Sequence, residues 1–268
     1  MTVGYTYAQP MSHTYSRTRT RTRYTAFSLL KVADVCLAQS GFLPPAAASM
    51  KQAVVVGASR GLGLALTAQL LLRRSAQAPA SYRVLAAARS PSLELDQLEE
   101  RHRGRLTTLD GVDVTKRETL QRLADAVEAC DLLLNVAGVL HEPADAATAA
   151  QERRMPERAL KEVDPEWMER VFRVNAVGPV LTTQALRPKL REGAVVANLS
   201  ARVGSIGDNK LGGWWSYRMS KAALNQATRN TAIELRRSNV IAVALHPGVV
   251  QTDLGRYIIG GVKAEDAH

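Results

Sequence analysis

The sequence has few cysteines, and they lie far apart. Only Cys36 and Cys130 occur among 268 residues, and no apolar signal-peptide core stands at the start. A disulfide framework is therefore not expected, and we expect an intracellular, reducing compartment. Cysteine and histidine also form no cluster with the spacing of metal ligands, so no metal site is predicted.

The chain also lacks a long hydrophobic run. A membrane-spanning helix needs about 18 to 20 apolar residues, whereas the apolar stretch "ALTAQLLL" ends at Arg73 and Arg74. We therefore predict no membrane span. Hydrophobic residues make up 46% and charged residues 22% of the sequence, which is typical of a globular protein.

Acidic residues are almost absent from the first 49 positions, where only Asp34 occurs. The stretch "SHTYSRTRTRTRYT" there alternates Arg with Thr and has no core-forming period. Three interpretations are open: an organellar transit peptide, a leader joined by a wrong start assignment before Met50, and a basic arm for nucleic acid. We expect a disordered or transit-peptide-like segment at 1–49 and one folded domain at 50–268. The location is then the cytoplasm, or a chloroplast or mitochondrion if the segment is a transit peptide.

The net charge of +10 does not by itself indicate a nucleic-acid partner. Outside the first 49 residues the basic side chains are scattered among acidic ones, which is the pattern of a solvated basic surface. We therefore predict no nucleic-acid partner for the folded part.

From Met50 onward, short β-rich runs alternate with helical patterns. Six runs have strand character: "AVVVGAS", "YRVLAAAR", "RLTTLDGVDV", "DLLLNVAG", "AVVANLS" and "NVIAVALHPG". Five helical patterns separate them, and one of these, "DPEWMERVFRVNAVGPVLTTQAL", begins with Asp164 as N-cap and Pro165 in the first turn. The alternation predicts a single α/β domain with a doubly wound parallel sheet of the Rossmann type.

A glycine-rich segment, "VGASRGLGLAL", joins the first strand to the first helix. Gly57, Gly61 and Gly63 allow a tight turn whose bare amides face the helix N-terminus, where a pyrophosphate would be held. A flexible strand-to-helix turn without a ligand is the alternative.

The second strand ends in Ala88 and Arg89, where an NAD-selective site would carry an acid for the ribose diol. Arg60 and Arg89 are suited to bind a 2′-phosphate through their guanidinium groups. The pattern favours NADP(H) over NAD(H); two surface arginines without a ligand are the alternative.

Several short motifs between residues 51 and 254 together resemble the short-chain dehydrogenase/reductase family. They are "GASRGLG", "DVT", "NVAG", "VNAVGP", "YRMSK" and "HPGVVQTDL", in that order. The chain is similar to the small carbonyl reductases of the C-factor and sniffer types. The resemblance implies an NADP(H)-dependent oxidoreductase that acts on a small-molecule carbonyl or secondary alcohol, and it implies a homo-oligomer.

The resemblance implies a proton-transfer role for Tyr217, with Lys221 binding the nicotinamide ribose and stabilising the tyrosinate. A free phenol has a pKa of about 10, so we expect a nearby cation to lower it, and helical spacing places Lys221 beside Tyr217. Asn175 would hold a water in a proton relay; a buried asparagine bonded to the backbone is the alternative.

The remaining cofactor contacts also follow from the resemblance. Asp113 and Val114 would border the adenine, although a plain turn or helix cap is the alternative for Asp113. The other implied contacts, on the glycine loop and at the strand ends, are Ser59, Leu62, Asn135, Ala137, Gly138, Pro247, Gly248 and Thr252.

The sequence departs from the family at the serine that polarises the carbonyl. It has "NLSARVG" where members usually have "NISS". Counting from Asn198 and Gly204 places Ala201 at the functional position, whereas counting from Gly193 places Ser200 there. We name Ser200 as the expected residue, with Ser205 as the second choice.

Two features leave a rival interpretation open. The resemblance implies a seventh strand beyond "TDL", but the sequence ends at His268, so we expect either a truncated C-terminus or a product that is not a working enzyme. Together with Ala201, this supports a dinucleotide-binding sensor or partner subunit as the alternative.

Trp214 and Trp215, beside the tyrosine, either line an apolar substrate pocket or pack the start of a helix.

Overall fold

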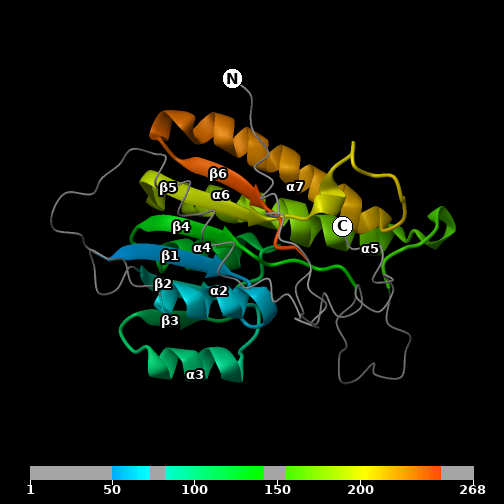
Figure 1. The fold of residues 1–268 in the computed structure, drawn as a ribbon. Coiled ribbons are helices and arrows are strands. Elements are labelled where there is room, and N and C mark those ends of the chain that lie inside the picture. The colour runs from blue at the N-terminus through cyan, green and yellow to red at the C-terminus, as the bar shows by residue number, and fades with distance from the viewer. Residues whose placement is uncertain (1–49, 73–81, 142–154, 249–268) are drawn as a thin grey trace, which may run out of the picture.

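The computed structural model describes residues 50–72, 82–141 and 155–248 (Figure 1). The segment 1–49, with its three open interpretations, lies outside these ranges, and so does Thr252. The domain boundaries therefore stay a prediction.

The described strands form one parallel sheet. They are β1 (Lys51–Val56), β2 (Tyr82–Ala87), β3 (Leu106–Leu109), β4 (Cys130–Asn135), β5 (Leu190–Leu199) and β6 (Ile241–Leu245). Their order is β3-β2-β1-β4-β5-β6, and every neighbouring pair is parallel. The predicted doubly wound α/β fold is confirmed.

Helices cover both faces of the sheet. The central strand β1 is accordingly apolar on both sides, as is typical of a parallel strand. Ala53 and Val55 belong to one buried cluster, and Val54 and Val56 belong to the other. The first face carries α2 (Gly61–Leu72) and α3 (Leu93–Arg101). The second carries α4 (Arg117–Asp125), α6 (Gly178–Leu186) and the end of the long helix α7 (Trp215–Glu234), which continues as a 3-10 turn (Leu235–Ser238).

The helix expected after Asp164 is interrupted in the structure. It begins as expected, since Asp164 accepts a hydrogen bond of 2.7 Å from the Trp167 N–H. However, α5 (Pro165–Phe172) gives way to a π-helical turn (Arg173–Val177) before α6 starts. π-helical turns are rare in proteins, and those that occur often lie at functional sites. This one contains Asn175.

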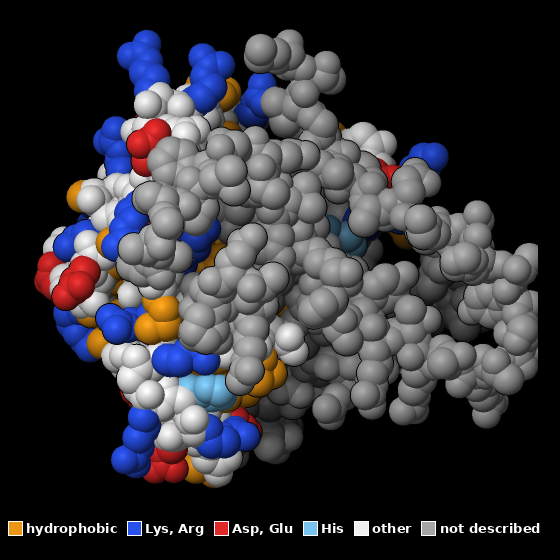
Figure 2. All heavy atoms as spheres, turned by 60° about the vertical axis from the view of Figure 1, so that its left-hand side comes forward, with side chains coloured by type: hydrophobic (Ala, Val, Ile, Leu, Met, Phe, Trp, Pro, Cys, Tyr) orange, Lys and Arg blue, Asp and Glu red, His pale blue; other side chains and the backbone are white. Residues whose placement is uncertain are grey.

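The face drawn in Figure 2 shows no single charged stripe among its described residues. Figure 2 shows Lys and Arg side chains spread over this face among acidic and apolar ones. Among the described residues, no helix is long and apolar enough to span a membrane.

Candidate active site

The glycine loop between β1 and α2 is closely packed. A Cβ atom on Gly63 would lie 2.0 Å from the carbonyl oxygen of Gly57, and one on Gly57 would lie 2.6 Å from the backbone nitrogen of Ala137. Gly57 also has a φ of 93°, which favours glycine. The turn therefore needs these two glycines, and it delivers the free amides of the first turn of α2 to the end of β1.

This loop lies where an α/β sheet binds its ligand. The strand order reverses between β1 and β4, and ligands bind outside the carboxyl ends of the strands at such a switch point. Gly138 follows β4 at that edge, and a Cβ atom there would lie 3.4 Å from Asn175 Oδ1 and 3.7 Å from Lys221 Nζ. The fold thus brings the glycine loop, Gly138, Asn175 and Lys221 to one edge of the sheet.

The two predicted phosphate-binding arginines are both exposed at this edge. Arg89 follows β2, and its loop is tied to the glycine loop because Ser92 Oγ donates a hydrogen bond of 2.6 Å to the carbonyl oxygen of Ser59.

Partial burial alone would raise the pKa of Asp113. Hydrogen bonds from Thr115 and the charges of Arg89 and Lys116 outweigh it, and the pKa lies below its usual value.

Asp113 forms the turn that was the alternative to an adenine contact. Its Oδ1 accepts hydrogen bonds from the Thr115 N–H and hydroxyl, at 2.9 and 2.7 Å. Next to it, Val114 is buried against Gly178, where a Cβ atom would come within 2.7 Å of Val114 Cγ2. The adenine contact stays a prediction for both residues.

Tyr217 and Lys221 meet on the first turns of α7. Lys221 is 4% exposed, and its Nζ lies 5.6 Å from the centroid of the Tyr217 ring. The same Nζ donates a hydrogen bond of 2.7 Å to the carbonyl oxygen of Leu199. The end of β5 therefore fixes the cation beside the phenol.

Burial dominates the titration of this pair. It raises the pKa of Tyr217 to about 12 and lowers the pKa of Lys221 to about 8. The lowered phenol pKa expected from the sequence does not appear here, because the cost of burying the tyrosinate prevails. At neutral pH the phenol keeps its proton and the lysine keeps its charge, which suits a proton donor with an adjacent cation.

Asn175 clamps the backbone of Val139. Its Oδ1 accepts from the Val139 N–H and its Nδ2 donates to the Val139 carbonyl oxygen, both at 2.8 Å. Nδ2 also donates to Ser220 Oγ at 3.1 Å, and Ser220 Oγ donates to the carbonyl oxygen of Tyr217 at 2.8 Å. The side chain thus makes the backbone contacts that were the alternative to a water relay, and it links the chain after β4 to α7.

The described contacts do not bring Ser200 to the tyrosine. Its side chain is buried, and its Oγ donates a hydrogen bond of 2.7 Å to Asn225 Oδ1. Asn225 lies eight residues beyond Tyr217, which is about two turns along α7. Ala201 follows in extended conformation and carries no hydroxyl, and Ser205 caps the 3-10 turn Arg202–Gly204.

The strand-end residues have mixed roles. Asn135 is buried, and its Nδ2 donates to Asn198 Oδ1 at 2.8 Å, which joins β4 to β5. Its own Oδ1 has no hydrogen-bond partner among the described residues. Pro247 and Gly248 are half-buried after β6, at the edge of the sheet that carries the site. Their predicted cofactor contacts, and that of Leu62, stay predictions.

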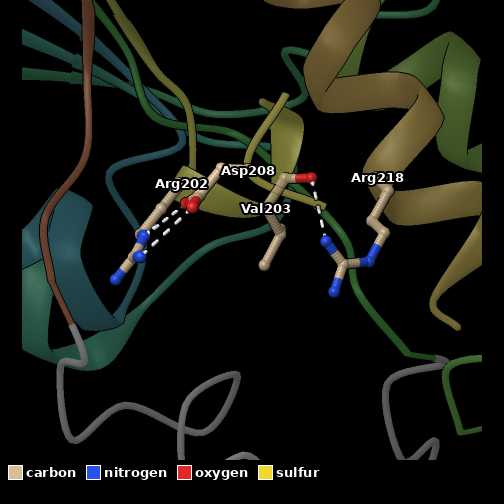
Figure 3. A network of polar contacts seen from close by, with 4 residues as sticks. All are labelled: Arg202, Val203, Asp208 and Arg218. Carbon is tan, nitrogen blue, oxygen red and sulfur yellow. Dashed lines mark hydrogen bonds and ion pairs between the residues drawn. The ribbon is translucent and has the colours of Figure 1, made fainter. Parts of the chain in front are cut away.

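Arg218, for which no role is predicted from the sequence, supports the loop before α7. Its Nε donates to the carbonyl oxygens of Gly212 and Gly213 at 3.1 Å, and Nη1 donates to that of Val203 at 3.4 Å. The same loop carries the Arg202–Asp208 ion pair, with 2.6 Å between Nε and Oδ2 (Figure 3). The sequence signal for this role is the glycine pair Gly212 and Gly213 shortly before α7, because a glycine-rich loop needs side-chain hydrogen bonds to fix its backbone.

The tryptophans differ in exposure. Trp214 precedes α7 with a φ of 51°, and its ring lies edge-on to Tyr217, with 6.3 Å between centroids. Trp215 is 37% exposed. Trp214 therefore packs at the start of the helix, whereas the substrate-pocket role of Trp215 stays a prediction.

Two curated relatives are similar to this chain. C-signal of Myxococcus xanthus is 50% identical over 99 residues, which cover 36% of this chain and 60% of that protein. The 1-hydroxy-2-glutathionyl-2-methyl-3-butene dehydrogenase of Rhodococcus sp. strain AD45 is 34% identical, over 76% of this chain and 80% of that protein.

Solved structures show the same architecture. An NADPH-bound carbonyl reductase from chicken fatty liver matches with a TM-score of 0.65 and 29% identity, over 81% of this chain and 85% of that one. The carbonyl reductase Sniffer of D. melanogaster matches with a TM-score of 0.65 and 25% identity, over 77% and 84%. The family model for short chain dehydrogenases matches residues 51–260. The chain therefore belongs to the short-chain dehydrogenase/reductase family.

Proposed function

We propose that this protein is an NADP(H)-dependent reductase that converts a small carbonyl compound to an alcohol, with Tyr217 as proton donor. The observation that carries the proposal is the pairing of Tyr217 with a buried Lys221, whose Nζ lies 5.6 Å from the ring centroid beside Gly138. Two solved relatives described as carbonyl reductases, one of them NADPH-bound, support the same chemistry.

The free amides of α2 and the glycine loop would hold the pyrophosphate of the cofactor, with Arg60 and Arg89 binding its 2′-phosphate. When bound, NADPH supplies the hydride. Tyr217 donates its proton to the carbonyl oxygen, and the charge of Lys221 stabilises the phenolate that remains. Asn175 keeps Val139 and Ser220 in place around that pair.

The experiment that tests this function is an NADPH-oxidation assay of the full chain with a panel of aliphatic and aromatic aldehydes and ketones. Carbonyl-dependent NADPH oxidation, with a stoichiometric alcohol product, is the expected result. Saturable NADPH binding without turnover on any carbonyl would favour the rival function, a dinucleotide-binding sensor or partner subunit, which the engagement of Ser200 by Asn225 also supports.

Arg89→Ala is expected to weaken NADPH binding by about 10-fold or more, because a charge-assisted bond to the 2′-phosphate is worth roughly 1.5 to 3 kcal/mol. NADH binding should not change, since NADH has no such phosphate. Both dissociation constants are measured by fluorescence titration. Arg83→Ala, an exposed arginine on β2, is the matched control. An equal loss for both cofactors would remove Arg89 from phosphate binding.

Ser200→Ala is expected to lower kcat by less than about 10-fold, well below the loss of roughly 100-fold or more seen when an oxyanion donor is removed. The reason is that the hydroxyl already donates to Asn225. Steady-state kinetics with one reactive carbonyl measure the effect. A larger loss would show that the hydroxyl leaves Asn225 and binds the substrate oxygen, which is the role expected from the sequence.

A further inference from the structure

Glu157 is a buried carboxylate that the proposed chemistry does not use. Its side chain is 4% exposed. Burying an ionised carboxylate is costly unless hydrogen bonds compensate for the lost water. The hydrogen bonds of Glu157 therefore indicate its structural role.

The contacts between Glu157 and other described residues lead to the start of α7. The carboxylate accepts hydrogen bonds from the Ser216 hydroxyl and, at 3.3 Å, from the Ser216 N–H. The backbone carbonyl oxygen of Glu157 accepts the Trp214 N–H at 2.5 Å. Trp214 is the residue before the helix, and its own side chain makes no capping bond. Glu157 therefore takes the place of an N-cap, with its negative charge at the positive end of the helix dipole.

The two residues that Glu157 holds both adjoin Tyr217, one along the chain and the other through its ring. Ser216 precedes the tyrosine in the first turn, and the Trp214 ring lies edge-on to the phenol, at an interplanar angle of 75°. The left-handed backbone of Trp214 is costly for a residue of this type, so the bond from its N–H stabilises a conformation that is otherwise unfavourable.

The rest of α7 is anchored independently of Glu157. Lys221 bonds to Leu199, Asn225 accepts from Ser200, and Thr228 Oγ1 accepts from Asn198 Nδ2 at 2.9 Å. Losing the Glu157 contacts would therefore free the first turn, and the phenol with it, while the remainder of the helix stays docked on the sheet.

We propose that Glu157 is a positioning residue for Tyr217, which fixes the phenol by capping α7 through Ser216 and Trp214. The inference rests on the proposed reductase function, because it concerns the position and orientation of the Tyr217 hydroxyl as proton donor. A displacement of about 1 Å at such a group can lower the rate by roughly 100-fold.

The test compares Glu157→Gln, Ser216→Ala and the double variant with the wild-type protein. Glu162→Gln is the matched control, since Glu162 lies on the same segment but is exposed and accepts the Arg158 N–H, at 2.8 Å. We expect Glu157→Gln and Ser216→Ala each to lower kcat by about 10- to 100-fold with the NADPH dissociation constant unchanged. The double variant should lose little more than the worse single one, because both changes weaken the same contact between Glu157 and Ser216.

Near-ultraviolet circular dichroism supplies a readout that needs no turnover. The signal of the Trp214–Tyr217 pair should change in Glu157→Gln and Ser216→Ala but not in Glu162→Gln. If the wild-type protein reduces no carbonyl while these spectra change as expected, the proposed function fails and the positioning role stands.

A folded Glu157→Gln protein with wild-type kcat and spectrum would overturn the proposal. So would a loss of kcat that Glu162→Gln shares, or strictly additive losses in the double variant. If Glu157→Gln does not fold, Ser216→Ala keeps the carboxylate, removes only one donor and is judged by the same criteria.

Discussion

Tyr217→Phe is expected to lower kcat for carbonyl reduction by about 1,000-fold, because general acid catalysis typically contributes between roughly 100- and 10,000-fold. The variant removes only the phenol oxygen and keeps the ring that packs against Trp214. The affinity for NADPH should not change, since the glycine loop and Arg89 are untouched. Steady-state kinetics and a fluorescence titration measure the two quantities on the same preparation.

Tyr82→Phe is the control for this result. It deletes the same atom from a buried tyrosine at the start of β2 and should leave kcat unchanged. Retained turnover in Tyr217→Phe would mean that another group donates the proton. A loss of NADPH binding in step with kcat would mean that the hydroxyl serves cofactor binding rather than proton donation.

Lys221→Met is expected to lower kcat by about 100-fold or more, because the variant removes the charge that stabilises the developing phenolate. The wild-type pH profile should report the same charge. Since the pKa of Lys221 is about 8, the lysine is charged below that pH, and the reduction rate should be flat there and fall above it. The phenol does not add to this fall, because its pKa is about 12.

Lys221→Arg separates charge from shape. A guanidinium stays protonated throughout this range, so the fall above about pH 8 should disappear even though the overall rate is lower. The profile is measured as kcat against pH at saturating NADPH. A fall at the same pH in the arginine variant would assign the titration to another group.

The parts of the fold that local patterns encode were predictable. Apolar strands alternating with helical stretches predict a parallel sheet, and Gly63 is required by its close contact with Gly57 within the strand-turn-helix. The Tyr217–Lys221 pairing likewise follows from helical spacing. These features depend on neighbours within a few residues along the chain.

Features that depend on distant contacts were not predictable. The π-helical turn at Asn175 leaves the apolar pattern of a helix intact, so the sequence indicated one continuous helix. Glu157 caps a helix 59 residues away, and no local pattern reveals such a partner. For Ser200, two ways of counting were open because neighbouring strand residues face opposite sides, and only the Asn225 contact shows where its hydroxyl lies.

Every catalytic role proposed above depends on the binding of NADP(H) at the edge formed by the glycine loop, Arg89 and Lys221. A fluorescence titration of the full chain with NADPH and, in parallel, with NADH measures this binding. Saturable binding with a clear preference for NADPH is the expected result. Binding of neither cofactor, or equal binding of both, would contradict the account at its foundation.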